Sequence, residues 1–376
     1  MRILYVTTIS LTMNSFFKPH IKMLFDEGHH VDIACNSSEL QLDSLYSELG
    51  CVAYQIDFSR SPLSKNNIKA FGQLKKVIES GNYDIVHCHT PNASVITRLV
   101  CRKFRKRTGL KVFYTAHGFH FYKGAPKLNW MVYYPVEKFC SRFTDKLITI
   151  NKEDYELAKN KFKAKEVHYV PGVGIDLSRF ENVQVDRNAK RREIGVPEDA
   201  FLLFSVGELN ENKNHQVIIK AMAQINDLRL HYAIAGVGDK RDYLIELAES
   251  LGLADRVHLL GYRKDVAELN KSADLFCFPS LREGLSVSLM EAMASSMPVI
   301  CSLIRGNVDL MNHFQGFLFD PSDADQCKAV LLKIFATDLD FIAKENAKQV
   351  SYFSKENVLL NMRKVYGIPH VLIRGK

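Results

Sequence analysis

Two glutamates eight residues apart enclose the segment with the most distinctive chemistry in the chain. The segment runs from Glu283 to Glu291 and has the sequence EGLSVSLME. It follows a predicted strand and opens a predicted helix, so Gly284 permits close approach of the backbone and the helix start offers unpaired amides. Such a helix start binds a diphosphate, and nearby carboxylates accept hydrogen bonds from sugar or ribose hydroxyls. The alternative is an acid at a helix start plus a surface glutamate, with no ligand.

Histidines stand at the ends of two predicted strands in the first half of the chain. His87 and His89 end one strand, and His117 follows the next strand, Lys111–Thr115, just before Gly118. Because open α/β sheets bind ligands at the carboxyl ends of their strands, His117 is a candidate catalytic residue. A histidine there could instead cap a turn. One of His87 and His89 is expected to be a core histidine with satisfied hydrogen bonds.

Three further polar residues are candidates for ligand contacts. Ser10 and Asn14 lie in a predicted loop, Thr8–Ser15, directly after the first predicted strand, and His120 lies close to His117. Such side chains supply polar contacts in a cleft, but they equally suit turns and helix caps.

Short runs rich in β-branched residues alternate with helical patterns and predict parallel sheets. In the first half the predicted strands are Arg2–Thr7, His30–Ala34, Ile85–His89, Lys111–Thr115 and Lys146–Ile150, and the predicted helices are Phe17–Glu27, Asn66–Glu79 and Ala93–Arg107. In the second half the strands are Phe201–Gly207, His231–Ala235, Val257–Leu260, Leu275–Pro279 and Pro298–Cys301, and the helices are Gln216–Gln224, Asp242–Ser250 and Ser286–Ser295. This alternation predicts an α/β protein with two Rossmann-like, doubly wound domains facing a central cleft.

The restart of the strand pattern sets the expected domain boundaries. We expect an N-terminal domain of residues 1–169, a C-terminal domain of residues 170–354, and a tail of residues 355–376. Residues 170–197 are predicted to form a linker, and Lys355–Tyr366 a helix that returns to the first domain.

Length and composition are those of a soluble globular protein. The chain has 376 residues, 47% of them hydrophobic, which is enough for two or three domains with real cores. We find no export signal and no apolar run of the roughly 18 residues that span a bilayer, which predicts a cytoplasmic protein. The eight cysteines form no CxxC pair, so we expect a reduced compartment and no structural metal.

Positive charge is concentrated in the first half of the chain. Residues 1–165 contain 25 Lys and Arg against 14 Asp and Glu, whereas the remainder contains 25 against 28. Such asymmetry indicates an anionic partner, which could be a membrane surface, a lipid phosphate or a nucleic acid.

A membrane partner is favoured over a nucleic acid by the local patterns. The basic run Arg102–Arg107 follows an apolar helical stripe, and each such charge near an anionic leaflet contributes about 1 kcal/mol. A solvated helix end is the alternative. The aromatic stretch Phe119–Tyr134 has the character of an acceptor-side loop, although aromatic residues more often pack. Because no nucleic-acid-binding module is recognisable, we expect no nucleic-acid partner. From the basic residues we expect a peripheral position on the inner face of the plasma membrane.

The Glu-x7-Glu pattern after a strand ending in Pro-Ser resembles the hallmark of the family 4 retaining glycosyltransferases, which have the GT-B fold. The resemblance covers nearly the whole chain, and other motifs follow the family's order: Val86–Pro91, Ala116–Gly118, Gly172–Asp176, Ser205–Lys213 and Ala235–Gly238. The closest likeness is to capsular and exopolysaccharide enzymes of the CapM type.

The resemblance implies that residues 1–169 form the acceptor domain, with Ser10, Asn14 and His120 on the acceptor side, and that residues 170–354 form the donor-nucleotide domain. It also implies roles for individual residues. Glu283 would contact the donor sugar, Glu291 the ribose hydroxyls, and Lys213 the leaving diphosphate, while His117 would reach the donor sugar or the reaction centre. The predicted catalytic residues are therefore His117, Lys213 and Glu283. The predicted donor-binding residues are Gly207, Arg263, Gly284, Leu285, Ser286, Val287 and Glu291.

The chain departs from the family pattern at two places. Glu208 stands where the family usually has an arginine, and a glutamate would repel the diphosphate. Arg263, Arg282 or Arg305 could supply the lost charge. The Gly-Gly pair that the family often has in its first loop is absent. For Lys213 itself, a solvated loop lysine is the alternative.

Two other motifs carry less chemistry. Gly236 and Gly238 form part of a dinucleotide fingerprint without its third glycine, which predicts a tight turn near the nucleotide and not an NAD site. The Asp-x-Asp pairs that begin at Asp323 and Asp338 are predicted to cap helices. We therefore expect no metal and no cofactor beyond the nucleotide-sugar substrate.

The predicted reaction moves a sugar from a nucleoside-diphosphate sugar, with UDP implied by the resemblance, to a lipid-linked or glycan acceptor in bacterial capsule or exopolysaccharide synthesis. Retention of configuration is implied by the family. With no carboxylate that stands out as a nucleophile, we favour front-face attack with the leaving diphosphate as base. The alternatives are a UDP-sugar 2-epimerase-like isomerase and a non-catalytic sugar-nucleotide-binding subunit.

Overall fold

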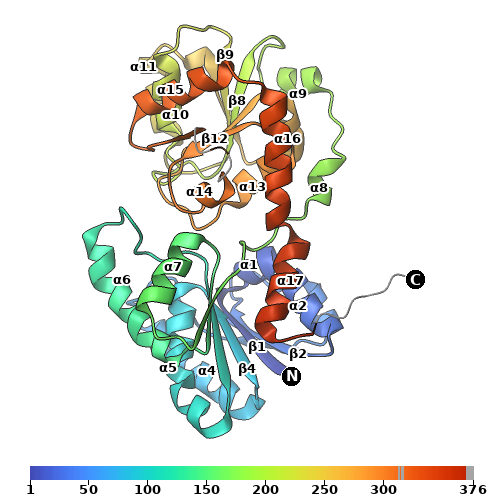
Figure 1. The fold of residues 1–376 in the computed structure, drawn as a ribbon, viewed down its shortest axis with the longest axis vertical. Coiled ribbons are helices and arrows are strands. Elements are labelled where there is room, and N and C mark those ends of the chain that lie inside the picture. Colours follow the sequence, from blue (N-terminus) through green and yellow to red (C-terminus); the bar gives the residue numbers. More distant parts are fainter. Residues whose placement is uncertain (312–313, 315–316, 370–376) are drawn as a thin grey trace. The chain divides into compact units, whose positions relative to one another are not determined.

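The computed structural model describes residues 1–311, 314 and 317–369. The chain divides into two compact units, shown in Figure 1. Unit 1 comprises Met1–Val173 and Val358–Lys376, and unit 2 comprises Gly174–Asn357. Each unit is built on a parallel sheet with helices packed against it, which confirms the predicted pair of Rossmann-like α/β domains. The predicted strands and helices named above are all present, with ends within two residues of those expected.

Unit 1 contains a seven-stranded parallel sheet in the order β3-β2-β1-β4-β5-β6-β7. Its strands are β1 (Arg2–Ile9), β2 (His30–Asn36), β3 (Ala53–Gln55), β4 (Ile85–His89), β5 (Lys111–Ala116), β6 (Lys146–Thr149) and β7 (Glu166–Tyr169). Its helices are α1 (Ser10–Thr12), a π-helical turn (Met13–Phe17), α2 (Lys18–Asp26), α3 (Ser44–Glu48), α4 (Asn66–Gly81), α5 (Pro91–Thr108), α6 (Lys127–Cys140) and α7 (Lys152–Lys161). The C-terminal helix α17 (Lys355–Tyr366) begins in unit 2, and from Val358 onward it belongs to unit 1.

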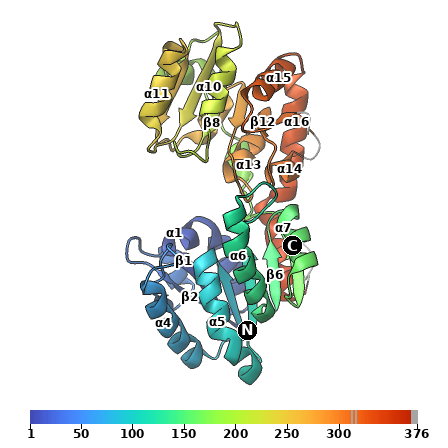
Figure 2. The same cartoon turned by 90° about the vertical axis from the view of Figure 1, so that its left-hand side faces the viewer.

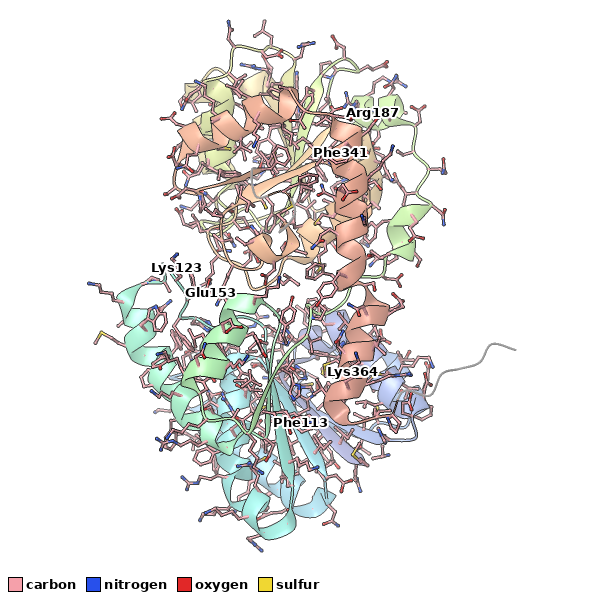
Figure 3. All side chains as sticks on the ribbon, viewed as in Figure 1. Phe113, Lys123, Glu153, Arg187, Phe341 and Lys364 are labelled. Carbon is pink, nitrogen blue, oxygen red and sulfur yellow. The ribbon has the colours of Figure 1, made fainter. Side chains whose placement is uncertain are left out.

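Helices cover both faces of this sheet, and Figure 2 shows α4, α5 and α6 side by side over one of them. One core lies under α4, α5, α6 and α7, and the other lies under α2, α3 and α17. Alternate residues of β1 serve the two cores, with Leu4 in the first and Tyr5 in the second. Phe113, labelled in Figure 3, contacts Tyr366 of α17 with ring centroids 5.5 Å apart.

Unit 2 contains a six-stranded parallel sheet in the order β10-β9-β8-β11-β12-β13. Its strands are β8 (Phe201–Val206), β9 (Leu230–Ala235), β10 (Val257–Gly261), β11 (Leu275–Phe278), β12 (Val299–Ser302) and β13 (Leu318–Phe319). Its helices are α8 (Ser178–Glu181), α9 (Arg187–Glu193), α10 (Gln216–Ala223), α11 (Arg241–Ser250), α12 (Val266–Ser272), α13 (Val287–Ala294), α14 (Asn307–Leu310), α15 (Ala324–Phe335) and α16 (Leu339–Val350). Helices α10, α11 and α15 pack together, and α9, α12, α13 and α16 form a second group.

The prediction that residues 181–197 form only a linker is wrong. They contain α9, whose Arg191 is fully buried and donates hydrogen bonds to the carbonyl oxygens of Ser272 and Ala200 at 2.9 and 2.7 Å and to Asp274 at 2.6 Å. The segment looks like a linker because it is polar, but its central arginine satisfies buried acceptors of unit 2.

None of the described helices is long and apolar enough to cross a membrane. The Asp-x-Asp prediction is confirmed, because Asp323 and Asp338 accept hydrogen bonds from the first amides of α15 and α16.

Candidate functional site

The predicted anion site of unit 2 lies between β11 and α13. Ser286 is the N-cap residue of α13, and its hydroxyl accepts a hydrogen bond from the amide of Leu289 at 3.3 Å. The first amides of a helix have no partner inside the helix and lie at the positive end of its dipole. Ser286 and Leu285 are buried, so the turn that carries Gly284 is held firmly at the start of α13.

Lys213 and Glu283, which lie 70 residues apart in the sequence, contact each other directly. Their Nζ and Oε1 atoms are 2.7 Å apart, and both side chains are mostly buried, with exposed fractions of 20% and 17%. Lys213 Nζ also lies 4.9 Å from the centre of the Phe278 ring. The structure therefore brings two of the three predicted catalytic residues together at the end of β11.

Hydrogen bonds tie the two loops that carry this pair. The amide of Leu281 donates to the carbonyl oxygen of Asn212 at 2.8 Å. The side chain of Asn214 donates to the carbonyl oxygen of Pro279 at 3.2 Å. The amide of Lys213 is itself held by the side chain of Asn210 at 3.0 Å. The position of the lysine is thus fixed by the backbone on both sides.

Glycines allow neighbouring strand-end loops to approach one another closely. A Cβ atom on Gly236 would lie 1.8 Å from the carbonyl oxygen of Gly207, and one on Gly306 would lie 2.2 Å from that of Gly284. Gly306 also has φ +79°, a conformation that other residues adopt at a cost. The predicted donor residues Gly207 and Gly284 are therefore packed against glycines of other loops.

The other charged groups of this region include Glu291, Arg179, Arg282 and Arg305. Burial raises the pKa of Glu291, and the charge of Arg179 opposes that shift. Arg305 is largely buried, and its Nε donates to the carbonyl oxygen of Glu283 at 3.2 Å. Glu208 and Arg282 are exposed. Of the three arginines considered as replacements for the missing cation, Arg305 contacts the Glu283 loop.

Arg263, the remaining predicted donor residue, follows β10 and forms ion pairs within unit 2. Its guanidinium binds Asp265 and Glu193, each with a closest distance of 2.5 Å. These contacts hold the pKa of Asp265 well below its usual range. The charge of Arg263 is therefore already balanced by two carboxylates.

In unit 1, the half-buried His117 contacts a cluster of buried histidines and aromatic rings. Its Nε2 lies 3.3 Å from Nδ1 of His89, which packs on Phe17 with ring centroids 4.2 Å apart. Burial lowers the pKa of His117 to about 4 and that of His20 to about 4. These imidazoles are neutral near pH 7. A neutral His117 can donate or accept a hydrogen bond but carries no charge.

His87 is the core histidine that the sequence led us to expect. Its Nδ1 lies 2.5 Å from the hydroxyl of Tyr366 and its Nε2 lies 2.8 Å from Oγ1 of Thr115. Burial lowers the pKa of both His87 and His89 well below the usual value.

The prediction that Thr8–Ser15 forms a loop is wrong. β1 continues to Ile9, and helical turns begin at Ser10. The Ser10 hydroxyl donates to the carbonyl oxygen of Leu40 at 2.5 Å. The Asn14 side chain donates to the carbonyl oxygen of Gln41 at 2.9 Å. These two residues hold the segment around residues 40 and 41, and neither side chain caps the helical turns in which it lies.

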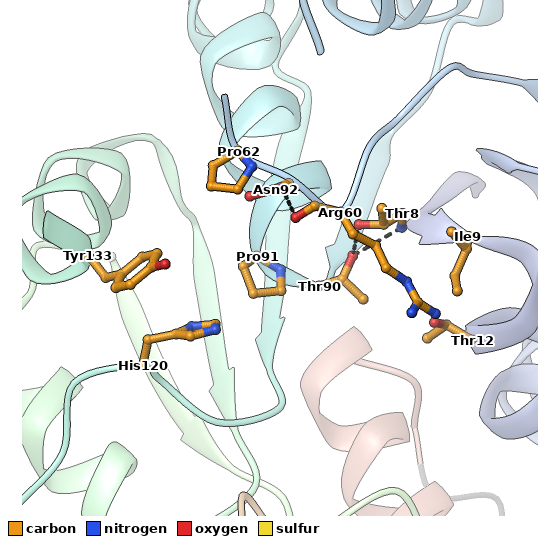
Figure 4. Close-up of a pocket in the computed structure, with 10 residues that line it drawn as sticks. All are labelled: Thr8, Ile9, Thr12, Arg60, Pro62, Thr90, Pro91, Asn92, His120 and Tyr133. Atoms are coloured by element: carbon orange, nitrogen blue, oxygen red, sulfur yellow. Dashed lines mark hydrogen bonds between the residues drawn. The ribbon is translucent and has the colours of Figure 1, made fainter. Parts of the chain in front are cut away.

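His120 lines a pocket of unit 1, drawn in Figure 4. Its ring stacks on that of Tyr133, with centroids 4.6 Å apart. Thr90 lines the same pocket with φ +63°, which is rare for a β-branched residue and typical of functional sites. Sequence reasoning missed Thr90 and Arg60. Thr90 carried a signal, since it stands between His89 and Pro91 at a strand-helix junction.

A histidine that the sequence analysis did not single out lies beside the lysine of unit 2. His215 is buried, its Nδ1 lies 3.0 Å from the hydroxyl of Tyr232, and burial together with the charge of Lys213 lowers its pKa to about 3. Among the described residues, no group of three His, Cys, Asp or Glu side chains could hold a metal ion.

Comparison with known families covers both units. The model described as "Glycosyl transferase 4-like" matches residues 2–151, and that described as "Glycosyl transferases group 1" matches residues 186–354. The chain is 38% identical to the protein named "Putative glycosyltransferase EpsD" of Bacillus subtilis (strain 168), over 86% of this chain and 84% of that protein. The chain belongs to the family 4 retaining glycosyltransferases.

Another relative of the transferase is named for its substrates. The chain is 29% identical to "UDP-Gal:alpha-D-GlcNAc-diphosphoundecaprenol alpha-1,3-galactosyltransferase" of Escherichia coli, over 71% of this chain and 70% of that protein.

Solved structures show that the transferase has the GT-B fold. Anabaena HepE, in a crystal structure with UDP, superposes with a TM-score of 0.78 at 17% identity and covers 98% of this chain and 100% of that chain. WaaG, described as a glycosyltransferase involved in lipopolysaccharide biosynthesis, superposes with a TM-score of 0.68 at 18% identity and covers 98% and 100% of the two chains. The transferase is therefore an enzyme with the predicted fold and family.

Proposed function

We propose that the transferase moves a sugar from a UDP-sugar to a lipid-diphosphate-linked acceptor during synthesis of a bacterial capsule or exopolysaccharide. The observation that carries the donor half is the contact of Lys213 with Glu283 beside the start of α13. The acceptor half is supported by a relative whose name contains diphosphoundecaprenol, and the pathway by the likeness to EpsD.

Each group of the unit 2 site has a place in the donor complex. The amides at the start of α13, Lys213 and Arg305 bind the diphosphate, because all of them present positive charge or N–H donors. Glu283 accepts a hydrogen bond from a sugar hydroxyl, and Glu291 accepts those of the ribose. Binding of the donor separates Lys213 from Glu283, so each gains a ligand contact in place of the other.

The transfer step requires no covalent intermediate. The acceptor hydroxyl oxygen bonds to the anomeric carbon as the bond from that carbon to the diphosphate oxygen breaks. The hydroxyl proton passes to the departing diphosphate, which leaves from the face that the acceptor attacks, so configuration is retained. Lys213 stabilises the negative charge that develops on the diphosphate as it leaves. Stabilisation of developing charge by a fixed group is usually the largest single term in catalysis. No metal takes part in this scheme.

We also infer a peripheral position of the enzyme on the inner face of the plasma membrane. The basic excess of residues 1–165 suits an anionic leaflet, where a lipid-linked acceptor would be met.

The test is acceptor-dependent release of UDP. The protein is incubated with UDP-sugars, with and without a bacterial membrane lipid extract, and UDP and product are measured. We expect UDP release only with the extract. Release of a new UDP-sugar epimer without acceptor would instead indicate an isomerase, and binding without turnover would indicate a non-catalytic subunit.

A matched pair of variants connects this activity to the site. Glu283→Gln should lower the transfer rate, whereas Glu211→Gln should not, because Glu211 is exposed and pairs only at the surface with Lys240 at 3.2 Å. An unchanged rate in Glu283→Gln would remove this residue from the mechanism.

A further inference from the structure

Two adjoining pockets in unit 1 share five lining residues. The smaller has a volume of about 280 Å³ and the larger about 380 Å³. The larger lies within the range of roughly 300–1,000 Å³ typical of small-molecule sites. The shared residues are Pro62, Pro91, Asn92, His120 and Tyr133. We call the smaller the polar pocket and the larger the apolar pocket.

The polar pocket presents groups suited to an anion. Arg60 lines it and is exposed, its guanidinium extends toward Thr12 (Figure 4), and it forms no ion pair with any described residue. None of the described residues that line the pocket is acidic. Thr90 and Asn92 line it as well, so the start of α5 lies in its wall, and no side chain caps that helix.

The start of α5 is held in place by a strained residue. The backbone amide and hydroxyl of Thr8 contact Oγ1 of Thr90 at 3.0 and 2.7 Å, which anchors Thr90 in its positive-φ conformation. The uncapped amides of this helix add to the positive potential around Arg60. A diphosphate has two charged groups, so it can bind a guanidinium and a helix start at the same time.

The apolar pocket has a different lining. Its walls come from α5 and α6 and from the segment after β5, and they include Val95, Ile96, Phe119, Phe121, Val132 and Val136. Its one lining acid, Glu137, is buried and bound to Arg98 at 2.8 Å. The pocket therefore offers hydrocarbon contacts with its charge already neutralised.

Exposed apolar residues lie at the opening of this pocket. Leu63 is 94% exposed, Val132 49% and Val136 42%, and all three line the apolar pocket. Apolar side chains left in water at the edge of a pocket mark a binding surface for an apolar ligand.

We propose that these pockets form one site for a polyprenyl diphosphate, with the diphosphate beside Arg60 and the isoprene units nearest to it in the apolar pocket. The five shared residues make the two parts continuous, as the bond between a diphosphate and its tail requires. This inference rests on the proposed function, since it identifies the lipid part of the acceptor. It assigns Arg60 to the acceptor and leaves the donor to unit 2.

The test uses farnesyl diphosphate as a probe, at concentrations below those at which it forms micelles and with no bilayer present. Binding to the full-length protein is measured by calorimetry and compared with that of pyrophosphate and farnesol. Farnesyl diphosphate should bind at least tenfold more tightly than either fragment. Arg60→Gln should weaken its binding about tenfold, as expected for loss of a hydrogen bond to a charged group. The same variant should leave farnesol binding unchanged.

A second pair of variants tests the apolar pocket. Val132→Glu should weaken farnesyl diphosphate about tenfold and leave pyrophosphate unchanged, because a carboxylate then lies against the tail. Met131→Glu is the matched control, since Met131 is 73% exposed on the same helix and does not line the pocket. Lys65→Gln is the control for Arg60, being an exposed cation in the same segment that lines neither pocket.

Several outcomes would overturn the proposal. Equal binding of farnesyl diphosphate and pyrophosphate would show that no tail site exists. Equal losses in Val132→Glu and Met131→Glu would show that the tail meets the helix surface and not the pocket. Short-chain phosphatidylglycerol that binds as tightly as the probe, with the same response to the variants, would indicate a general phospholipid site.

Failure of this inference is distinguishable from failure of the proposed function. UDP binding in unit 2 is measured separately on every variant and should stay within twofold of the unmodified protein. A protein that binds UDP and transfers sugar but ignores farnesyl diphosphate would refute the pocket alone. A protein that binds the probe but no UDP-sugar would refute the donor assignment alone.

Discussion

In unit 2 the loops after β8 and β11 hold opposite charges in contact, whereas in unit 1 the strands β4 and β5 lead into neutral histidines. Lys213 and Glu283 form a partly buried ion pair beside a helix start. His89 and His117 form a partly buried, uncharged contact at the ends of two neighbouring strands. Two sheets of the same kind thus present different electrostatics at their carboxyl ends.

The difference matches what each substrate would need. A nucleoside diphosphate carries its charge into the reaction and gains more as it leaves, so fixed cations suit it. An acceptor hydroxyl is neutral and must be oriented, so an uncharged imidazole suits it better than an imidazolium. The comparison predicts that charge changes in unit 2 affect turnover most.

The largest effect is expected from Lys213→Ala. The variant removes a cation from the diphosphate and leaves Glu283 without its partner, so kcat should fall by about 10²- to 10³-fold. Steady-state UDP release in the presence of lipid extract measures the change. Lys240→Ala is the control, because Lys240 pairs with Glu211 at the surface, where ion pairs contribute little. A loss below about threefold in Lys213→Ala would contradict an electrostatic role of this order.

Backbone packing around the charged loop is tested by Gly306→Ala. A methyl group there would lie 2.2 Å from the carbonyl oxygen of Gly284 and would sit on a backbone with φ +79°, so the Glu283 loop must shift. We expect a loss of about 2–3 kcal/mol in the free energy of unfolding and weaker UDP binding. Both are measured, by denaturant titration and by calorimetry.

Gly252→Ala separates strain from collision in that experiment. Gly252 has φ +68° but nothing within 4 Å of its added methyl group, so only conformational strain of about 1 kcal/mol applies. Its UDP affinity should be unchanged. Equal effects of the two substitutions would mean that the contact with Gly284 is unimportant.

The neutral histidines of unit 1 predict a loss of stability in acid. An unfolded histidine takes up a proton near pH 6.5, but burial keeps folded His20 neutral down to about pH 4. The stability that this group contributes is therefore complete above pH 6.5 and is lost as the pH falls toward 4. Between pH 7 and pH 5 the loss should be about 2 kcal/mol. His20→Leu should make the melting temperature less sensitive to pH over this interval.

The same reasoning predicts the behaviour of His117 in catalysis. Since burial lowers the pKa of His117 to about 4, its titration should not appear in kcat between pH 6 and pH 8. An inflection in that range that disappears in His117→Gln would show that the pKa of His117 rises into this range when substrate is bound.

The charged site was accessible to sequence analysis because its residues sit in short motifs at strand ends. Glu283 and Ser286 are close in the chain, and the resemblance to the family assigned Lys213 to the diphosphate, but only the structure shows that Lys213 contacts Glu283. The parallel sheets were equally accessible, since buried strands are short apolar runs with helices between them. The contacts of Gly236 with Gly207 and of Gly306 with Gly284 could not be predicted from the sequence, because they depend on which strands neighbour one another.

The pocket site of unit 1 could not be predicted in the same way. Arg60, Thr90, His120 and Tyr133 come from separate segments and form no motif. Ser10 and Asn14 were chosen by type, and the structure shows them bonded to residues 40 and 41 instead. Short strands such as β13, with two residues, also lack a detectable pattern.

The smallest effects are expected when Arg305 or Arg263 of unit 2 is replaced by alanine. Arg305 contacts the Glu283 loop, so Arg305→Ala should weaken UDP binding about tenfold, the usual effect of losing a charged hydrogen bond. Arg263 is held by Asp265 and Glu193, and drawing it to a ligand would leave both carboxylates without it. Arg263→Ala should therefore change UDP affinity less than about twofold and cost about 1 kcal/mol of stability. If Arg263→Ala instead weakened UDP more than Arg305→Ala, the cation that replaces the family's arginine would be Arg263, as the sequence allowed, and its ion pairs would have to open on donor binding.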